Sequence, residues 1–184
     1  MSEIQSPWPW SLPFPVQDVP PEGQQHHLAA DASVRSAVAR LAGLSEVARL
    51  EADLATVPHG SGGLHVTGRV AATVGQTCVV TLEPMQSDIE EPIDVLYLRN
   101  PPSGAHDAGS GAEEPGKVGD ERIEALAGDT VDLGAIATEF LILAIDPYPR
   151  KPDAVFAPPR ADEGPSSPFA ALAALKKAPG ERGG

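Results

Sequence analysis

Aromatic residues make up only 4% of this chain of 184 residues, and it holds a single cysteine, Cys78. The core must therefore be built from valine, leucine, isoleucine and alanine. One cysteine forms no internal disulfide, which favours a reducing compartment. The longest apolar run, around residues 140–145, is far shorter than the roughly 20 residues that span a bilayer. A secretory signal would need a basic stretch followed by an apolar one, which residues 1–25 lack. A cytoplasmic protein without a membrane segment is expected.

Basic residues are also scarce. Thirteen lysines and arginines stand against 26 aspartates and glutamates, which gives a formal net charge of −13. Affinity for nucleic acids comes largely from lysine and arginine side chains that displace counterions. DNA is therefore not an expected partner, extensive RNA binding is a weak hypothesis, and direct RNA contact stays open. A basic protein suits the charge better. The alternative is that the acidity serves solubility alone.

Glycine and proline, by contrast, are abundant, with 18 and 20 residues, and their positions indicate three parts. Residues 1–25 form a proline-rich N-terminal arm, which we expect to dock on the domain as extended chain. Residues 26–157 form a single domain that contains a mobile acidic loop at 100–122. Residues 158–184 form a linker and a short amphipathic C-terminal tail.

Two helices and four strands are predicted. Residues 31–43 carry apolar side chains at helical spacing, with Asp31 or Ser33 as the N-cap and Gly43 just past the end. A second, more buried helix begins after Asp132 and ends before the prolines that follow residue 146. Period-two alternation and turn signals predict strands at 46–57, 64–74, 77–83 and 89–98.

These elements predict an α+β fold. An antiparallel meander sheet is covered by the two helices, and glycines at 68 and 75 allow the sheet to curl toward a partial barrel. Gly75-Gln76 predicts a two-residue hairpin turn. The predicted core consists of Leu50, Leu54, Val66, Val70, Val80, Leu82, Ile136, Phe140, Leu141 and Leu143.

Few residues suggest catalysis or metal binding. The five histidines lack the spacing of a helical zinc site, and Cys78 has no second cysteine nearby, so neither a metal nor a cofactor is expected. Glu139 lies within the second helix and is either a satisfied carboxylate or the acid of a small hydrolase-like enzyme, in partnership with a histidine. The first interpretation is favoured, and no catalytic residue is assigned.

The C-terminal third carries the residues that we predict to bind a partner. Prolines keep the segment around Tyr148 extended, so that it loses little backbone entropy on binding. The tail presents apolar residues and a lysine on a short helix that would order only against a surface. The predicted partner-binding residues are Tyr148, Arg150, Lys151, Phe169, Leu172, Leu175 and Lys176. The oligomeric state is not indicated by the sequence.

Three features follow one another in a specific order. A strand pair, Gly68–Val74 and Cys78–Pro84, precedes Val131–Pro152, and Ser167–Lys176 comes last. In this order they resemble the YceD family, the large ribosomal RNA subunit accumulation proteins, in its alphaproteobacterial form, over about residues 10–177. The resemblance implies a non-enzymatic role in the accumulation of large-subunit ribosomal RNA. The tail and six further residues match the family pattern: Asp132, Leu133, Gly134, Glu139, Pro149 and Arg150.

The chain departs from that family at one position. Many members carry Cys-x-x-Cys-Leu in the returning strand, and Thr81 stands where the second cysteine would be. This departure argues against a shared metal or redox site. Charge and resemblance together favour a factor that binds a basic ribosomal protein, or a ribosomal precursor, during assembly. A structural adaptor unrelated to ribosomes is the remaining alternative.

Overall fold

The computed structural model describes residues 8–60, 62–101 and 122–156. The chain divides into two units, Met1–Ala154 and Val155–Gly184, and every described helix and strand lies in the first. The division into arm, domain and tail stays a prediction. The predicted tail and most of the predicted acidic loop lie outside the described residues.

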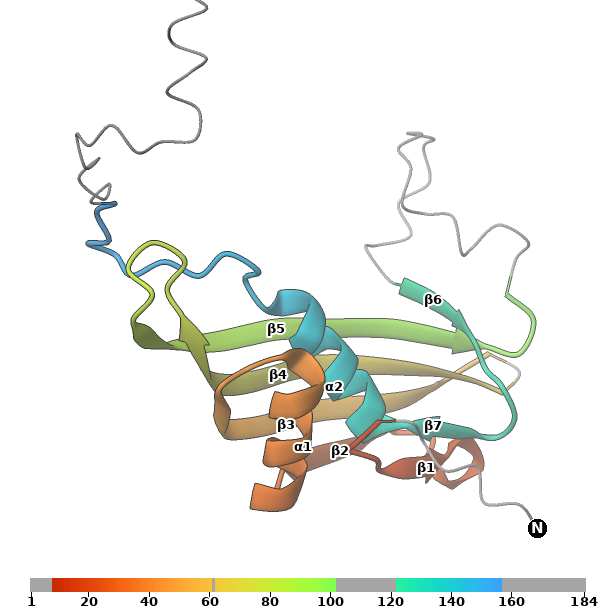
Figure 1. Ribbon diagram of the computed structural model, residues 1–184. Coiled ribbons are helices and arrows are strands. Elements are labelled where there is room, and N and C mark those ends of the chain that lie inside the picture. The colour runs from red at the N-terminus through yellow and green to blue at the C-terminus, as the bar shows by residue number, and fades with distance from the viewer. Residues whose placement is uncertain (1–7, 61, 102–121, 157–184) are drawn as a thin grey trace, which may run out of the picture. The chain divides into compact units, whose positions relative to one another are not determined.

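One five-stranded sheet dominates the first unit (Figure 1). Its strand order is β2-β3-β4-β5-β6, and all pairs are antiparallel except β5–β6, which is parallel. The sheet is open, so it does not close into the partial barrel that its glycines would allow. Its strands are β2 (Gln24–Ala29), β3 (Glu46–His59), β4 (Gly63–Thr77), β5 (Pro84–Leu98) and β6 (Arg122–Ala125).

Two helices, α1 (Ala32–Ala42) and α2 (Leu133–Ala144), cover the same face of the sheet (Figure 1). Asp31 caps α1 by accepting hydrogen bonds from the amides of residues 33 and 34, and Gly43 ends it in the left-handed conformation at φ 68°. Asp132 caps α2 through the amide of residue 135. Both capped helices confirm the predictions from the sequence.

Residues 10–16 pack on the same unit. Strand β1 (Pro13–Pro15) pairs with β7 (Thr130–Asp132) in a separate two-stranded sheet, and a 3-10 turn, η1 (Val16–Asp18), follows β1. Trp10 is buried in the core, and the amide of Leu133 donates to the carbonyl of Leu12. These contacts place β1 beside the start of α2.

The core lies between the sheet and the helices. Six of the predicted residues are buried there: Leu50, Leu54, Val66, Val70, Ile136 and Leu141. Phe140 is half-buried, while the expectation that Leu82 and Leu143 are buried is wrong, and Val80 is only half-buried. A register shift between residues 47 and 49 of β3 turns Ala48 outward, so that Val47 takes the core position.

The hairpin predicted at Gly75-Gln76 is wrong. Strand β4 continues to Thr77, and the returning strand β5 begins only at Pro84, so residues 78–83 form a turn in place of the predicted third strand. The first residues of β5 pair back to the end of β4, with Met85 opposite Gln76. A six-residue connection therefore projects from the end of the sheet.

Candidate functional site

Two segments that are far apart in the sequence meet at this end of the sheet. The β4–β5 turn, residues 78–83, lies beside residues 146–152, which follow α2 (Figure 1). The amide of Val79 donates to the carbonyl of Pro149 over 2.9 Å. The side-chain amide of Gln76 donates to the carbonyl of Asp146, also over 2.9 Å. The turn and the proline-rich segment therefore brace each other.

Cys78 is the buried centre of this contact. Its side chain has no exposed surface, and its Sγ accepts a hydrogen bond from the amide of Lys151 at 3.4 Å. Within the turn, the amide of Cys78 donates to Glu83, and the carbonyl of Cys78 accepts from the amide of Leu82. The thiol thus ties the turn to the segment after α2, and Cys78 does not lie in the strand predicted at 77–83.

Hydrogen bonds to this sulfur favour its thiolate form. Donation by the Thr81 side chain, followed by the amide of Lys151, lowers the pKa of Cys78 to about 6 from 9.0. Between these values the unfolded chain holds a proton that the folded chain does not, so this group adds most stability above about pH 9.0 and loses that contribution as the pH falls toward about 6.

We therefore expect Cys78→Ala to destabilise the protein more at high pH than at low pH. Urea denaturation of both proteins across this interval measures the difference in unfolding free energy. The difference should widen steadily as the pH rises, because only the natural chain carries the thiolate. A constant difference would show that Cys78 contributes by packing alone.

The structure places the predicted partner-binding residues of this region in two different settings. Tyr148 is 69% exposed, and Arg150 is exposed with no ion pair among the described residues. Lys151 is half-buried, and its Nζ lies 2.7 Å from a Glu83 carboxylate oxygen. This hydrogen bond lowers the pKa of Glu83. Lys151 therefore helps to hold the turn, whereas Tyr148 and Arg150 face solvent. Phe169, Leu172, Leu175 and Lys176 lie outside the described residues.

Leu82 is the site residue that sequence reasoning missed. It is 76% exposed, and at φ 59° it is the one non-glycine residue with a positive φ in the part of the chain that the structure describes. A bulky residue rarely adopts this left-handed conformation, which costs about 1–2 kcal/mol. Val79, on the same turn, is 42% exposed. A strained and exposed leucine is a feature that packing does not explain.

We call Val79, Leu82, Tyr148 and Arg150 the turn surface. Its apolar members come from both segments, which the hydrogen bond from the Val79 amide to the Pro149 carbonyl joins. The sequence contained one signal that residues 78–83 form a turn. Pro84 lacks an amide hydrogen and is typical of the first residue of a strand, which would have ended the turn at residue 83.

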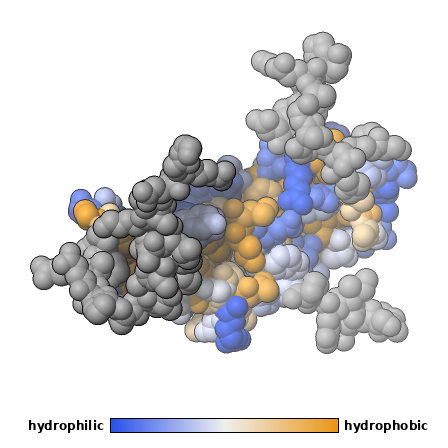
Figure 2. Space-filling model, turned by 45° about the horizontal axis from the view of Figure 1, so that its top comes forward, coloured by the Kyte–Doolittle hydropathy of each residue, from blue (hydrophilic) through white to orange (hydrophobic). Residues whose placement is uncertain are grey.

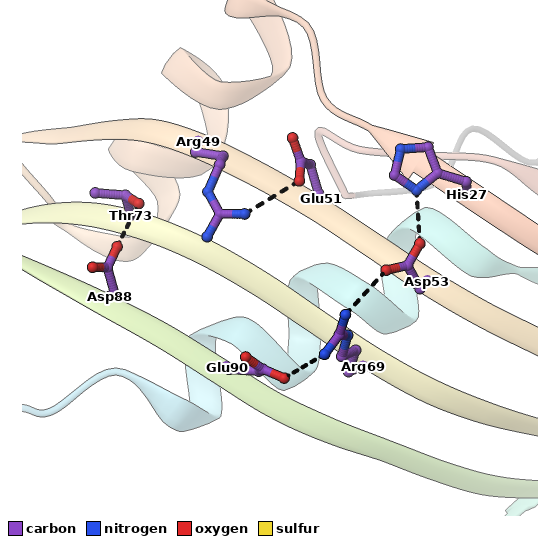
Figure 3. Close-up of polar contacts among 8 residues, drawn as sticks. All are labelled: His27, Arg49, Glu51, Asp53, Arg69, Thr73, Asp88 and Glu90. Carbon is purple, nitrogen blue, oxygen red and sulfur yellow. Dashed lines mark hydrogen bonds and ion pairs between the residues drawn. The ribbon is translucent and has the colours of Figure 1, made fainter.

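The face of the sheet opposite the helices is polar (Figure 3). On it, Asp53 lies 2.7 Å from His27 and 3.7 Å from Arg69, which also reaches Glu90 at 2.8 Å. The hydrogen bond with His27 lowers the pKa of Asp53 and raises that of His27. Two arginines, Arg49 and Arg69, face six carboxylates in the contacts of this face: Glu46, Glu51, Asp53, Asp88, Glu90 and Asp94. The outer face is therefore acidic.

Glu139 meets none of the histidines that the structure describes. Its carboxylate lies 2.9 Å from the guanidinium of Arg122, which also reaches Glu124 at 2.7 Å. The cavity beside it, about 140 Å³, contains Tyr97 and no histidine among its lining residues. His65 pairs with Asp94 on the outer face, and His26 bonds to Thr56. Within the described residues, the acid–histidine pair that the hydrolase hypothesis requires is therefore not assembled.

Residues 8–60, 62–101 and 122–156 contain no cluster of three or more histidine, cysteine, aspartate or glutamate side chains that could hold a metal ion. Within the same described residues, no helix is long and apolar enough to cross a membrane. The surface view shows apolar side chains in a band between hydrophilic ones (Figure 2).

The molecule is a small α+β protein with an open, mostly antiparallel sheet, two covering helices and a braced turn at one end. Residues 66–176, more than half of the chain, match the family described as Large ribosomal RNA subunit accumulation protein YceD. The chain belongs to this family. Both segments that build the turn surface lie within the matched range. Searches of the curated proteins and of the solved structures returned no match.

Proposed function

We propose that this protein acts as a non-enzymatic factor in ribosome assembly by binding a basic protein of the large ribosomal subunit. Family membership indicates involvement in the accumulation of large-subunit ribosomal RNA. The protein partner is our inference, as is action in the cytoplasm. An acidic factor would bind a basic ribosomal protein by charge complementarity and release it when the protein binds ribosomal RNA.

The turn surface is the observation that carries the choice of a protein partner. Exposed leucine, valine and tyrosine side chains gain free energy by burial against another apolar surface, and a tyrosine is typical of binding hot spots. The bracing of the turn also lowers the entropy lost on binding. RNA offers phosphates, which the net charge of −13 repels.

The remaining predicted residues are proposed to extend this contact. Arg150 would contribute a hydrogen bond or ion pair at its rim. Phe169, Leu172, Leu175 and Lys176 are proposed to bind the same partner, and Lys151 to support the turn through Glu83. Neither DNA nor a membrane has a part in this proposal.

We expect the immobilised full chain to retain a basic large-subunit ribosomal protein from a lysate of the producing cells. Mass spectrometry identifies the retained protein, and rising salt should release it because the attraction is partly electrostatic. Treatment of the lysate with ribonuclease should leave the retained amount unchanged. Retention that requires intact RNA would contradict the proposal. Failure to retain any ribosomal protein at low salt, or to co-sediment with ribosomal precursors, would favour an adaptor unrelated to ribosomes.

A further inference from the structure

Strand β5 has an open edge along most of its length. Strand β6 pairs only with Val95–Leu98, whereas β4 pairs with β5 as far back as Pro84. Among the described residues, 84–94 therefore have a strand neighbour on one side only. Apart from Pro84 and Pro92, which have no amide hydrogen, alternate residues of such a strand direct their amide and carbonyl groups away from the sheet, where another strand can pair with them.

A groove runs beside this edge. It encloses about 380 Å³ between β5 and the residues at the end of α2. Its lining residues are Gln76, Ser87, Asp88, Ile89, Glu90, Glu91, Ala144 and Asp146. Because the side-chain amide of Gln76 donates to the carbonyl of Asp146, the groove adjoins the braced turn. Space is thus available next to the unpaired backbone groups.

The charged residues that line the groove are all acidic. Four of its lining residues are carboxylates, and no lysine, arginine or histidine lines it. Asp88 and Glu90 reach it from the outer face, where they contact Thr73 and Arg69, whereas Glu91 alternates with them and lies on the helix side. The carboxyl end of α2 adds partial negative charge, and the last turn of this helix carries no basic residue. Glu91 is half-buried and has no ion pair or hydrogen bond to another described side chain. The described carboxylates do not gather closely enough to hold a metal ion. Carboxylates beside an unpaired strand edge attract the cationic side chains of an extended chain.

We propose that the β5 edge binds an extended lysine- and arginine-rich segment of a protein partner by adding it to the sheet as a further strand. The backbone of the segment would pair with β5, and its cationic side chains would lie along the acidic groove. This inference rests on the proposed function, because it names the part of the basic ribosomal partner that the protein holds.

Charge complementarity selects this occupant over a second copy of the chain. Two β5 edges placed side by side would bring Asp88, Glu90 and Glu91 of one copy against the same carboxylates of the other, which costs free energy. RNA would bring its phosphates to the same carboxylates. A basic peptide can form hydrogen bonds with the unpaired backbone groups of β5 and place positive charge beside the carboxylates.

A fluorescently labelled peptide of alternating lysine and valine is the probe, and anisotropy measures its binding to the full chain. The peptide should bind at low salt, and Glu91→Lys should weaken binding by roughly tenfold because it reverses one charge in the groove. Glu22→Lys is the matched control, since Glu22 is exposed in the turn before β2, and it should have a much smaller effect. Equal binding by the natural chain and Glu91→Lys would overturn the inference.

A second peptide separates strand addition from simple attraction. N-methylation of alternate backbone amides keeps every lysine but removes the donors needed for pairing, so this peptide should not bind detectably. In the natural chain, the unmethylated peptide should slow amide hydrogen exchange within residues 84–94. Equal binding of both peptides, or unchanged exchange, would overturn strand addition. If the edge fails these tests while the ribosomal protein is still retained by the turn surface, the proposed function stands without it.

Discussion

Leu82→Gly should leave the protein about as stable as the natural chain and yet remove most of its binding to the ribosomal partner. At φ 59°, glycine avoids the strain that leucine bears. The gain is offset by the entropy of glycine in the unfolded chain, so the unfolding free energy should change by less than about 1 kcal/mol. The loss of an exposed apolar anchor should weaken association by roughly tenfold or more.

Leu41→Ala provides the matched control for this prediction. Leu41 is an exposed leucine on α1, so its removal tests whether any surface leucine matters. Thermal unfolding reports stability, and the amount of ribosomal protein retained by the immobilised chain reports association. A large loss of stability in Leu82→Gly, with association intact, would mean that Leu82 serves the turn and not a partner.

Leu141→Ala should have the largest effect on stability. Leu141 has no exposed surface and lies in the core cluster between α2 and the sheet. Removal of a fully buried leucine side chain typically costs about 2–5 kcal/mol, because apolar contacts are lost and a cavity remains. This is a large fraction of the about 5–15 kcal/mol that separates folded from unfolded protein. Urea denaturation measures the loss.

Phe140→Ala is the companion variant on the same helix. Phe140 is only half-buried, so the cost should fall below the about 3–5 kcal/mol typical of a fully buried phenylalanine. The order of the two effects tests which face of α2 packs against the sheet. A greater loss for Phe140→Ala than for Leu141→Ala would contradict the packing described above.

The sequence correctly predicted the elements that are marked by nearby residues, such as helix caps and alternating strand residues. Both helices begin at aspartates whose side chains cap them, and α1 ends at a glycine in the left-handed conformation. The long strands β3 and β4 alternate with period two, so their core faces could be assigned except at the register shift near Ala48. The family could also be identified from the sequence, because the order and spacing of three segments carry the resemblance.

Elements that depend on distant partners were not predicted. Strand β6 forms a short parallel pair with the end of β5, and β7 pairs with the arm strand β1. Both β6 and β7 are too short for the alternation of apolar and polar residues to be recognised in the sequence. The turn surface was missed because Cys78, Val80 and Leu82 alternate like a strand. The pairing of β4 with β5 and the contacts of the turn with Pro149 and Lys151 show that it leaves the sheet.

The central claim is that the protein acts in the accumulation of large-subunit ribosomal RNA through a protein that it binds at the turn surface. A photo-crosslinking amino acid at position 82, in the cells that make the protein, tests it most directly when crosslinked protein and RNA are both identified. We predict crosslinks to a basic protein of the large ribosomal subunit, and far fewer from the same group at position 41. Crosslinks from position 82 to nucleotides of the large-subunit ribosomal RNA, without such a protein, would contradict the claim.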